Sequence, residues 1–358
     1  MLTNDDRAWL EALTHLPTIA GREEAVVAFI EGWAAERDGV AIRRDMAGNL
    51  VLSGPHPPRR PPLLITAHLD HPGFVAGEGG AVSFRGGMGA PYFDGAPAVE
   101  FFPIDGAPVV GTLTTWDAEA GVGTVDVDVA PGTIGRWHFD PTDLGIVDGV
   151  LRAPGCDDLA GVAAALSVLE RTRTDPDLGH VGLLLTRAEE VGFVGAIAAC
   201  VEGTIAPDAR LVCLETSRAF DWAPVGAGPV VRVGDRVSVF TPELTDRVSV
   251  IAGDLDRPTQ RKLMDGGACE ATAFVAHGLA ATCVCLPLGN YHNQGDLDRV
   301  EAGDGEAVPA PEYIALDDHA GLVELLVAVA RRLDEEREGE GLAERLVRRY
   351  DDHKHLLT

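Results

Sequence analysis

The sequence has few basic residues and no long apolar run. Lys and Arg number 29 against 56 Asp and Glu, which gives a formal net charge of −27. A surface this acidic repels the phosphates of nucleic acids and of anionic lipids, so we expect neither nucleic acid nor a membrane as a partner. No apolar stretch of about 18 residues is present, and no basic segment followed by an apolar run opens the chain. We therefore expect a cytoplasmic protein.

Cysteine is also scarce, with six in 358 residues. A chain of this length buries enough apolar surface to fold without disulfide bonds, and 46% of its residues are apolar. We expect reduced thiols and no structural zinc site made of cysteines. The length is typical of a large domain accompanied by a smaller one.

Strand and helix patterns alternate over most of the chain. Short apolar runs typical of buried strands occupy residues 63–67, 181–186, 211–214, 230–233 and 281–286. Helical periodicity occupies residues 5–36, 160–171, 195–201, 268–277 and 319–336. The alternation predicts an α/β fold with a mixed central sheet flanked by helices on both faces.

Residues 71–149 have a different texture. Glycine is frequent, helix formers are sparse, and short β-like runs alternate with turns. We expect a small all-β domain here, inserted into an α/β domain made of residues 1–70 and 150–336. Residues 337–358 form a highly charged tail.

A histidine and an acid follow the first buried strand. Side chains two residues apart on a strand face the same way, so His68 and Asp70 can act together. The imidazole could bind a metal while the carboxylate holds its other ring nitrogen. A strand-end histidine paired with a local acid is the ordinary alternative.

Two pairs of adjacent carboxylates come next. Asp157 and Asp158 open the helix at 160–171, where they could cap the helix or bridge two metals. Glu189 and Glu190 follow the strand at 181–186. Because neighbouring like charges in a cleft are costly without a cation, one could be a metal ligand and the other a general base. A solvated loop is the alternative.

Glu215 and His292 complete the set, each after an apolar strand. No single segment is specific. Strand ends converge at one edge of an α/β sheet, so these side chains could meet there. Two histidines and three carboxylates suit Zn²⁺, or Co²⁺ and Mn²⁺ when these are available.

The order His-x-Asp, Asp-Asp, Glu-Glu, acid, His resembles that of the TET-type, or glutamyl (deblocking), aminopeptidases. These belong to the co-catalytic dizinc metallopeptidases, and the resemblance spans roughly residues 5–335. It implies two divalent ions per chain: one bound by His68 and Glu215, one by Glu190 and His292, with Asp157 bridging.

The resemblance further implies that Glu189 is the general base and that Asp70 orients His68. The insert at 71–149 has the position of the family's dimerisation domain. This implies a homo-oligomer, either a dimer or a dodecamer built from dimers that admits only short peptides.

The chain departs from the family pattern at several positions. Cys269-Glu270 stands where Thr-Asp is usual, and Glu215 where Asp is common. His71-Pro72 follows Asp70 where Glu and an aliphatic residue are frequent, and Asn293 follows His292 in place of Ser. None of these changes removes a ligand.

These features favour a metallo-aminopeptidase in which two metals activate a water and Glu189 takes its proton. A metal-dependent deacylase acting on small N-acyl substrates is an alternative, as is a non-catalytic scaffold on the same fold. A glycosidase using Glu189 and a second carboxylate would need no metal, but it would leave His68 and His292 without a role.

Overall fold

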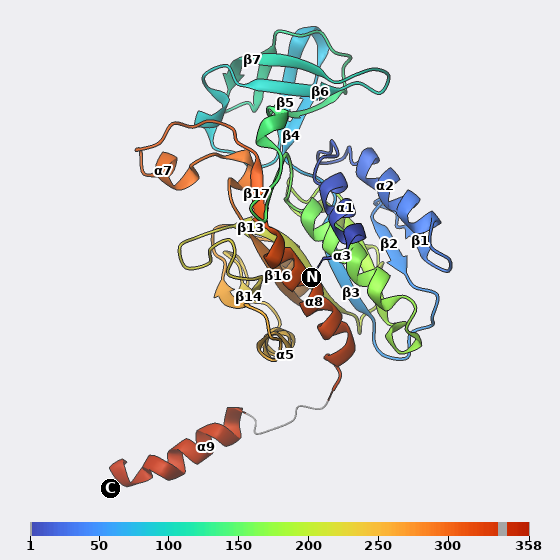
Figure 1. The fold of residues 1–358 in the computed structure, drawn as a ribbon, viewed down its shortest axis with the longest axis vertical. Coiled ribbons are helices and arrows are strands. Elements are labelled where there is room, and N and C mark those ends of the chain that lie inside the picture. The colour runs from blue at the N-terminus through green and yellow to red at the C-terminus, as the bar shows by residue number, and fades with distance from the viewer. Residues whose placement is uncertain (1, 336–341, 358) are drawn as a thin grey trace.

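An eight-stranded mixed sheet forms the centre of the protein, in a computed structural model that describes residues 2–335 and 342–357 (Figure 1). In spatial order its strands are β1 (Ala41–Arg44), β2 (Leu50–Ser53), β12 (Val181–Thr186), β3 (Leu63–His68), β13 (Arg210–Arg218), β16 (Ala280–Leu288), β14 (Val230–Gly234) and β15 (Gln260–Leu263). The four middle strands, β12, β3, β13 and β16, run parallel to one another. Their carboxyl ends therefore lie at one edge of the sheet.

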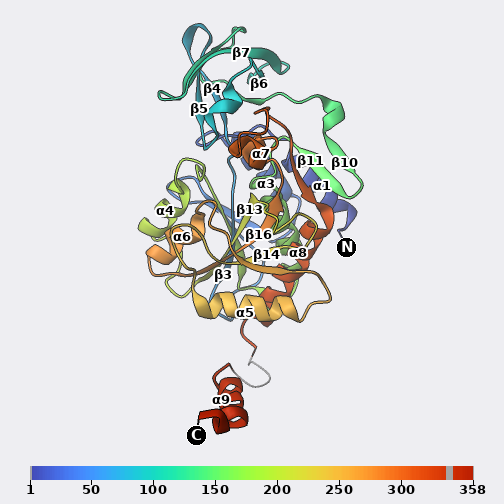
Figure 2. The same ribbon diagram turned by 90° about the vertical axis from the view of Figure 1, so that its left-hand side faces the viewer.

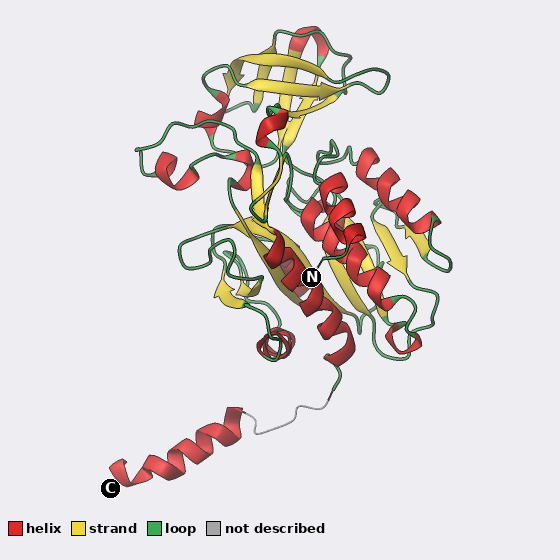
Figure 3. Ribbon diagram, viewed as in Figure 1, coloured by secondary structure: helices red, strands yellow, loops and turns green. Residues whose placement is uncertain are grey.

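Helices cover both faces of this sheet, as Figure 2 shows from the side, and Figure 3 draws the helices in red. One face carries α1 (Asn4–Leu13), α2 (Glu24–Ala35), α3 (Leu159–Thr172), α5 (Pro242–Gly253) and α8 (Leu316–Arg332). The other carries α4 (Val194–Val201) and α6 (Glu270–Ala276). Alternate residues of β3 separate the two cores, since Ile65 packs in the first and Leu64 against the second. Burial on both faces explains why the central strands are continuous apolar runs.

A closed six-stranded barrel stands at one end of the molecule (Figures 1 and 2). Its strands, in order around the barrel, are β4 (Gly73–Ala76), β5 (Ala81–Arg85), β8 (Val122–Val125), β7 (Val109–Asp117), β6 (Ala98–Phe102) and β9 (Ile134–Trp137). A cluster of aromatic rings fills it, with Phe93 stacked on Trp116 at 4.0 Å between ring centroids. The predicted fold class is confirmed: a mixed α/β sheet with a small all-β unit.

Three strands after the barrel belong to a separate sheet. β10 (Gly145–Val147) pairs with β11 (Val150–Ala153), which pairs with β17 (Glu312–Ala315). The remaining helices are α7 (Leu297–Glu301) and α9 (Leu342–His353), and α9 lies apart from the body in Figure 1. The expected charged tail coincides with α9 in part, and its residues 337–341 and 358 lie outside the described ranges.

Several element boundaries differ from the sequence predictions. β13 runs on to Arg218 because β16 continues beside it to Leu288 and supplies ladder partners. The last long helix begins at Leu316 and ends at Arg332, not at 319 and 336. α5, β15 and the barrel strands β4 and β9 were not predicted. All six cysteines are free thiols, and none of the described helices is long and apolar enough to cross a membrane.

Candidate metal centre

Most of the candidate side chains come from the carboxyl ends of the parallel strands. His68 is the last residue of β3, and Glu189 and Glu190 follow β12 after a short turn. Glu215 lies within β13, opposite Cys285 of β16, rather than after the strand as the sequence suggested. His292 follows β16 in the 3-10 turn η5 (Tyr291–Asn293). The sheet thus brings residues more than 200 positions apart to one edge.

One group of ligand atoms comes from His68, Asp157 and Glu215. One atom of each lies within 4.8 Å of the others, and all three side chains are buried. Nε2 of His68 is 3.4 Å from Oδ1 of Asp157. Asp157 precedes α3, and Thr216 Oγ1 donates a hydrogen bond to its Oδ1 at 2.9 Å.

A second group comes from Asp157, Glu190 and His292, again within 4.8 Å. Nε2 of His292 is 3.3 Å from Oδ2 of Asp157 and 3.4 Å from Oε2 of Glu190. Asp157 is therefore common to both groups and presents one oxygen to each histidine. A carboxylate placed in this way can bridge two cations.

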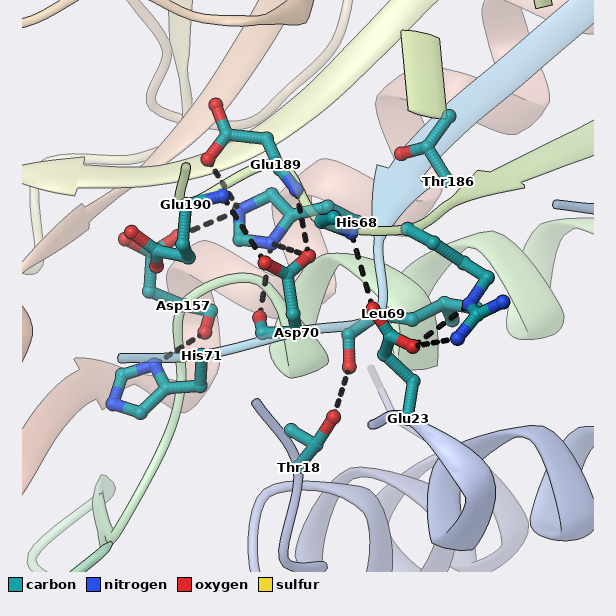
Figure 4. A network of polar contacts seen from close by, with 12 residues as sticks. Thr18, Glu23, His68, Leu69, Asp70, His71, Asp157, Thr186, Glu189 and Glu190 are labelled. Carbon is teal, nitrogen blue, oxygen red and sulfur yellow. Dashed lines mark hydrogen bonds and ion pairs between the residues drawn. The ribbon is translucent and has the colours of Figure 1, made fainter. Parts of the chain in front are cut away.

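Glu189 and Asp70 stand beside the two groups (Figure 4). Oε2 of Glu189 is 3.9 Å from Nε2 of His68, and Glu189 forms a third group of possible ligand atoms with His68 and Glu190, which does not contain Asp157. The expected bond from His68 Nδ1 to the Asp70 carboxylate is long, at 3.7 Å, because Nδ1 donates instead to the Asp70 carbonyl at 3.0 Å. The Asp70 carboxylate accepts the backbone N–H groups of Glu189 and Glu190 at 2.9 and 3.1 Å. It therefore fixes the turn that carries both glutamates.

Burial and mutual repulsion disturb the acids strongly. Burial, followed by repulsion from Asp157, raises the pKa of Glu190 to about 7. Burial and the nearby Glu189 raise the pKa of Glu215 well above its usual range. Burial alone would lower the pKa of His292, but the carboxylates of Glu190 and Asp157 outweigh it and raise the pKa to about 9. Mutual repulsion of these carboxylates therefore favours a bound proton or another bound cation.

The residues fit a pair of divalent cations. Oε1 of Glu190 and Oε1 of Glu215 are buried without a hydrogen-bond partner among the described residues. A buried carboxylate oxygen without a partner is costly unless a cation or donor meets it. Imidazole nitrogens and carboxylate oxygens together are the donor set that zinc and its neighbours prefer.

Two side chains that hold the candidate ligands in place were not recognised from the sequence. The buried carboxylate of Glu312 accepts the backbone N–H groups of Cys156, Asp157 and His292 at 2.6, 3.0 and 2.8 Å. His71 Nδ1 donates to the carbonyl oxygen of Asp157 at 2.6 Å. His71 was noted only as a departure from the family pattern, and Glu312 stands in a short segment without any motif.

A cavity of about 450 Å³ opens beside the cluster. Glu189, Glu190, Glu215 and His292 line one side of it. Arg232 also lines it, although its side chain is only 3% exposed. The cavity is therefore acidic beside His292 and basic at this buried guanidinium.

Residues 119–306, just over half of the chain, match the sequence profile of the M42 glutamyl aminopeptidases. This stretch includes Asp157, Glu190, Glu215 and His292, whereas His68 precedes it.

Solved peptidase structures share the whole fold. The TET1 peptidase of Pyrococcus horikoshii, which assembles into a tetrahedron or a large octahedral shell, is 20% identical with a TM-score of 0.72 over 91% of this chain and 99% of its own. The aminopeptidase APDkam598 of Desulfurococcus kamchatkensis is 18% identical with a TM-score of 0.73 over 94% and 99%. The TET aminopeptidase of Thaumarchaeota archaeon SCGC AB-539-E09 is 17% identical with a TM-score of 0.74 over 93% and 98%.

Proposed function

The chain belongs to the M42 glutamyl aminopeptidase family, and from this premise we propose that the buried cluster is the active centre of a two-metal aminopeptidase acting on short peptides. Members of this family are metal-dependent hydrolases of peptide bonds, so this protein is one as well. The observation that carries the finer proposal is the sharing of Asp157 between two three-residue groups of ligand atoms.

His68, Asp157 and Glu215 would hold one ion, and Asp157, Glu190 and His292 the other. Zinc suits this donor set, with cobalt or manganese as alternatives. Two divalent ions bound there would polarise the carbonyl group of the scissile peptide bond. They would also lower the pKa of a water molecule so that it ionises near neutral pH.

Glu189 is the proposed general base. Burial, followed by repulsion from Glu190, raises the pKa of this carboxylate above its usual range, which is the direction that suits a group that accepts a proton. Its Oε2 lies 3.9 Å from Nε2 of His68, and although Glu189 forms a third group with His68 and Glu190, it is outside both groups that contain Asp157. Glu189 would take the proton of the attacking water on this oxygen and pass it to the leaving amine. Asp70 holds the Glu189 backbone in place.

The free α-amine of the substrate distinguishes an aminopeptidase from a deacylase. The acidic end of the cavity would bind this ammonium group and would not favour an N-acylated substrate. We expect turnover of aminoacyl anilides and none of the matching N-acetyl anilides, each assayed with Zn²⁺, Co²⁺ or Mn²⁺. Turnover of the N-acetyl series alone would favour the deacylase.

Arg232 is the proposed determinant for an acidic N-terminal residue, in keeping with the family's glutamyl name. Its Nη1 donates to Ser217 Oγ at 3.1 Å and its Nη2 to the Met264 carbonyl at 3.4 Å. No carboxylate of residues 2–335 or 342–357 forms an ion pair with it, and its buried Nε has no partner there. The Nε–H is therefore a donor that a substrate carboxylate could accept.

Substitution of this residue gives a direct test. Arg232→Gln should lower kcat/KM for glutamyl anilide far more than for leucyl anilide. Arg236→Gln is the matched control, since Arg236 lines the same cavity but is exposed. Equal losses on both substrates would assign Arg232 a purely structural role.

The barrel is the proposed joint between subunits. The similar TET1 peptidase assembles into a tetrahedron or a large octahedral shell. We propose a homo-oligomer of at least two chains, with the dodecamer as the larger form. A hollow shell would restrict the substrates to short peptides.

A further inference from the structure

One segment of the barrel reaches back to the candidate metal centre. Between β5 and β6 the chain runs through Gly87, Met88 and Gly89 and then the 3-10 turn η2 (Ala90–Phe93). The first three of these residues line the cavity beside His292. The barrel is therefore part of the wall of the site as well as a separate unit.

This segment sets the orientation of the His292 ring. Nδ1 of His292 lies 2.5 Å from the carbonyl oxygen of Gly87. A carbonyl only accepts hydrogen bonds, so Nδ1 carries a hydrogen and Nε2 is the nitrogen that remains for a metal. Nε2 faces Oδ2 of Asp157 and Oε2 of Glu190. A hydrogen bond of this kind fixes both the tautomer and the direction of a ligating histidine.

Two more hydrogen bonds hold the segment against the loop after His292. The backbone N–H of Gly89 donates to Oε1 of Gln294 at 2.8 Å. The amide of Gln294 is oriented by its Nε2, which donates to the Tyr291 carbonyl at 3.1 Å. The buried hydroxyl of Tyr92 donates to the carbonyl oxygen of Gly295 at 2.7 Å. Gly89 and Tyr92, both from the barrel segment, thus form hydrogen bonds with Gln294 and Gly295, the two residues that follow Asn293.

The loop needs such support. His292 and Asn293 have φ values of 55° and 61°, in the left-handed region that residues other than glycine rarely adopt. Such a conformation persists only where surrounding contacts determine it. The Glu312 carboxylate supplies one contact, at the His292 N–H. The barrel supplies the contact to the ring itself.

Among residues 2–335 and 342–357, the other proposed metal position, at His68 and Glu215, has no comparable hydrogen bond to the barrel. Nδ1 of His68 donates to the carbonyl of Asp70, only two residues further along the chain. Glu215 lies within the central strand β13. Loss of the barrel contacts should therefore affect the two positions unequally.

We infer that the barrel segment 87–92 positions His292 for metal binding, and that Gln294 and Tyr92 are the side chains through which it does so. This inference rests on the proposed two-metal function. It makes the ion at His292 depend on the barrel, whereas the ion at His68 and Glu215 does not depend on it.

The test is a stepwise metal titration of Gln294→Ala, Tyr92→Phe and the double variant. Each apo-protein is titrated with Zn²⁺ in competition with a chelator of known affinity, and binding is followed by calorimetry. We expect one of the two ions to bind roughly 10- to 100-fold more weakly, the usual effect of losing a contact that orients a ligand. Binding of the other ion stays at the wild-type value.

Matched controls are Tyr313→Phe, which removes a tyrosine hydroxyl outside these contacts, and Gln260→Ala. Gln260 makes amide contacts to the carbonyl groups of Pro224 and Gly228, away from the barrel. Both controls should bind two ions with wild-type affinity. The same loss in a control would contradict the inference, as would equal weakening of both ions or no weakening in the double variant.

A His292→Ala background separates a positioning role from a general structural one. If the barrel segment acts through this ring, Tyr92→Phe has no further effect on metal affinity once the ring is gone. An undiminished effect in that background would overturn the inference. Failure of the wild-type protein to bind two ions is a different result, because it refutes the proposed function itself.

Discussion

Removal of the metals should make the stability of the protein fall as the pH rises. In the metal-free protein, burial and Asp157 raise the pKa of Glu190 from 4.5 to about 7. The unfolded chain releases this proton near pH 4.5, whereas the folded protein keeps it until about pH 7. The folded state therefore loses stability as the pH rises between these values.

His292 acts with the same sign in a higher range. Its pKa rises from 6.5 to about 9, because the Glu190 and Asp157 carboxylates outweigh the effect of burial. The protonated ring stabilises the folded state fully below pH 6.5, and this stability is lost as the pH rises to about 9. Asp157, whose pKa is lowered, is ionised throughout this range and adds no slope.

The size of the expected stability loss follows from the differences between the folded-state and unfolded-state pKa values of Glu190 and His292. At roughly 1.4 kcal/mol for each pH unit, the gap for each group corresponds to about 3 kcal/mol. The two contributions are not additive, since Glu190 and His292 contact each other at 3.4 Å. We therefore expect a loss of about 3 kcal/mol or more between pH 5 and pH 9. At about 2 °C for each kcal/mol, the melting temperature should fall by roughly 6 °C.

Calorimetric melting at pH 5, 6, 7, 8 and 9, with chelator and with Zn²⁺, measures this loss. Cations replace the protons on the ligands, so the metal-loaded protein should not share the decline and the stabilisation by metal should grow with pH. Glu190→Gln, which keeps the shape but does not titrate, should flatten the metal-free curve. A metal-free stability that is constant or rises from pH 6 to 9 would refute the reasoning, as would parallel metal-free and metal-loaded curves.

Further predictions concern the base, the bridge and the assembly. Glu189→Gln should retain both ions and lose roughly two to four orders of magnitude in kcat; if it loses metal while Glu190→Gln does not, the two glutamates have exchanged roles. Asp157→Ala should release both ions, whereas His68→Ala should release one, as measured by elemental analysis after dialysis. Light scattering should give at least twice the 37.7 kDa chain mass, and a mass near one chain would exclude the oligomer. Replacing residues 73–148 with a Gly/Ser linker should give smaller particles and also weaken one ion, because Gly87 is removed.

The fold and the candidate ligands were predictable because their signals are local. Apolar runs such as 181–186 mark strands buried on both faces, and polar residues that follow such runs must lie at the sheet edge. His68, Glu190 and His292 could be selected in this way. Their grouping around Asp157 could be expected only from the resemblance to a family.

The contacts that support the ligands had no local signal. Gly87 and His292 are 205 positions apart, and nothing in a glycine predicts that its carbonyl will meet an imidazole. Glu312 begins the short strand β17, and nothing in the sequence around it distinguishes it from a surface acid. Only the fold brings its carboxylate within hydrogen-bond distance of three backbone N–H groups. Arg232 did have a signal, since a lone arginine inside the apolar run Val230–Gly234 must be buried or functional.

The position of Asp70 shows a limit of strand periodicity. Side chains at 68 and 70 would face the same way on a continuous strand, but β3 ends at His68. The chain then turns, so the Asp70 carbonyl meets the imidazole while its carboxylate holds the Glu189–Glu190 turn. The end of the strand, rather than its period, decides these contacts.

The metal content of the active protein tests the central claim most directly. Elemental analysis and hydrolysis of an aminoacyl anilide should be measured on the same purified sample, before and after treatment with a strong chelator and after readdition of Zn²⁺, Co²⁺ or Mn²⁺. The account predicts about two divalent ions per chain, loss of activity when they are removed, and recovery when they return. A protein that is free of metal and fully active would contradict it.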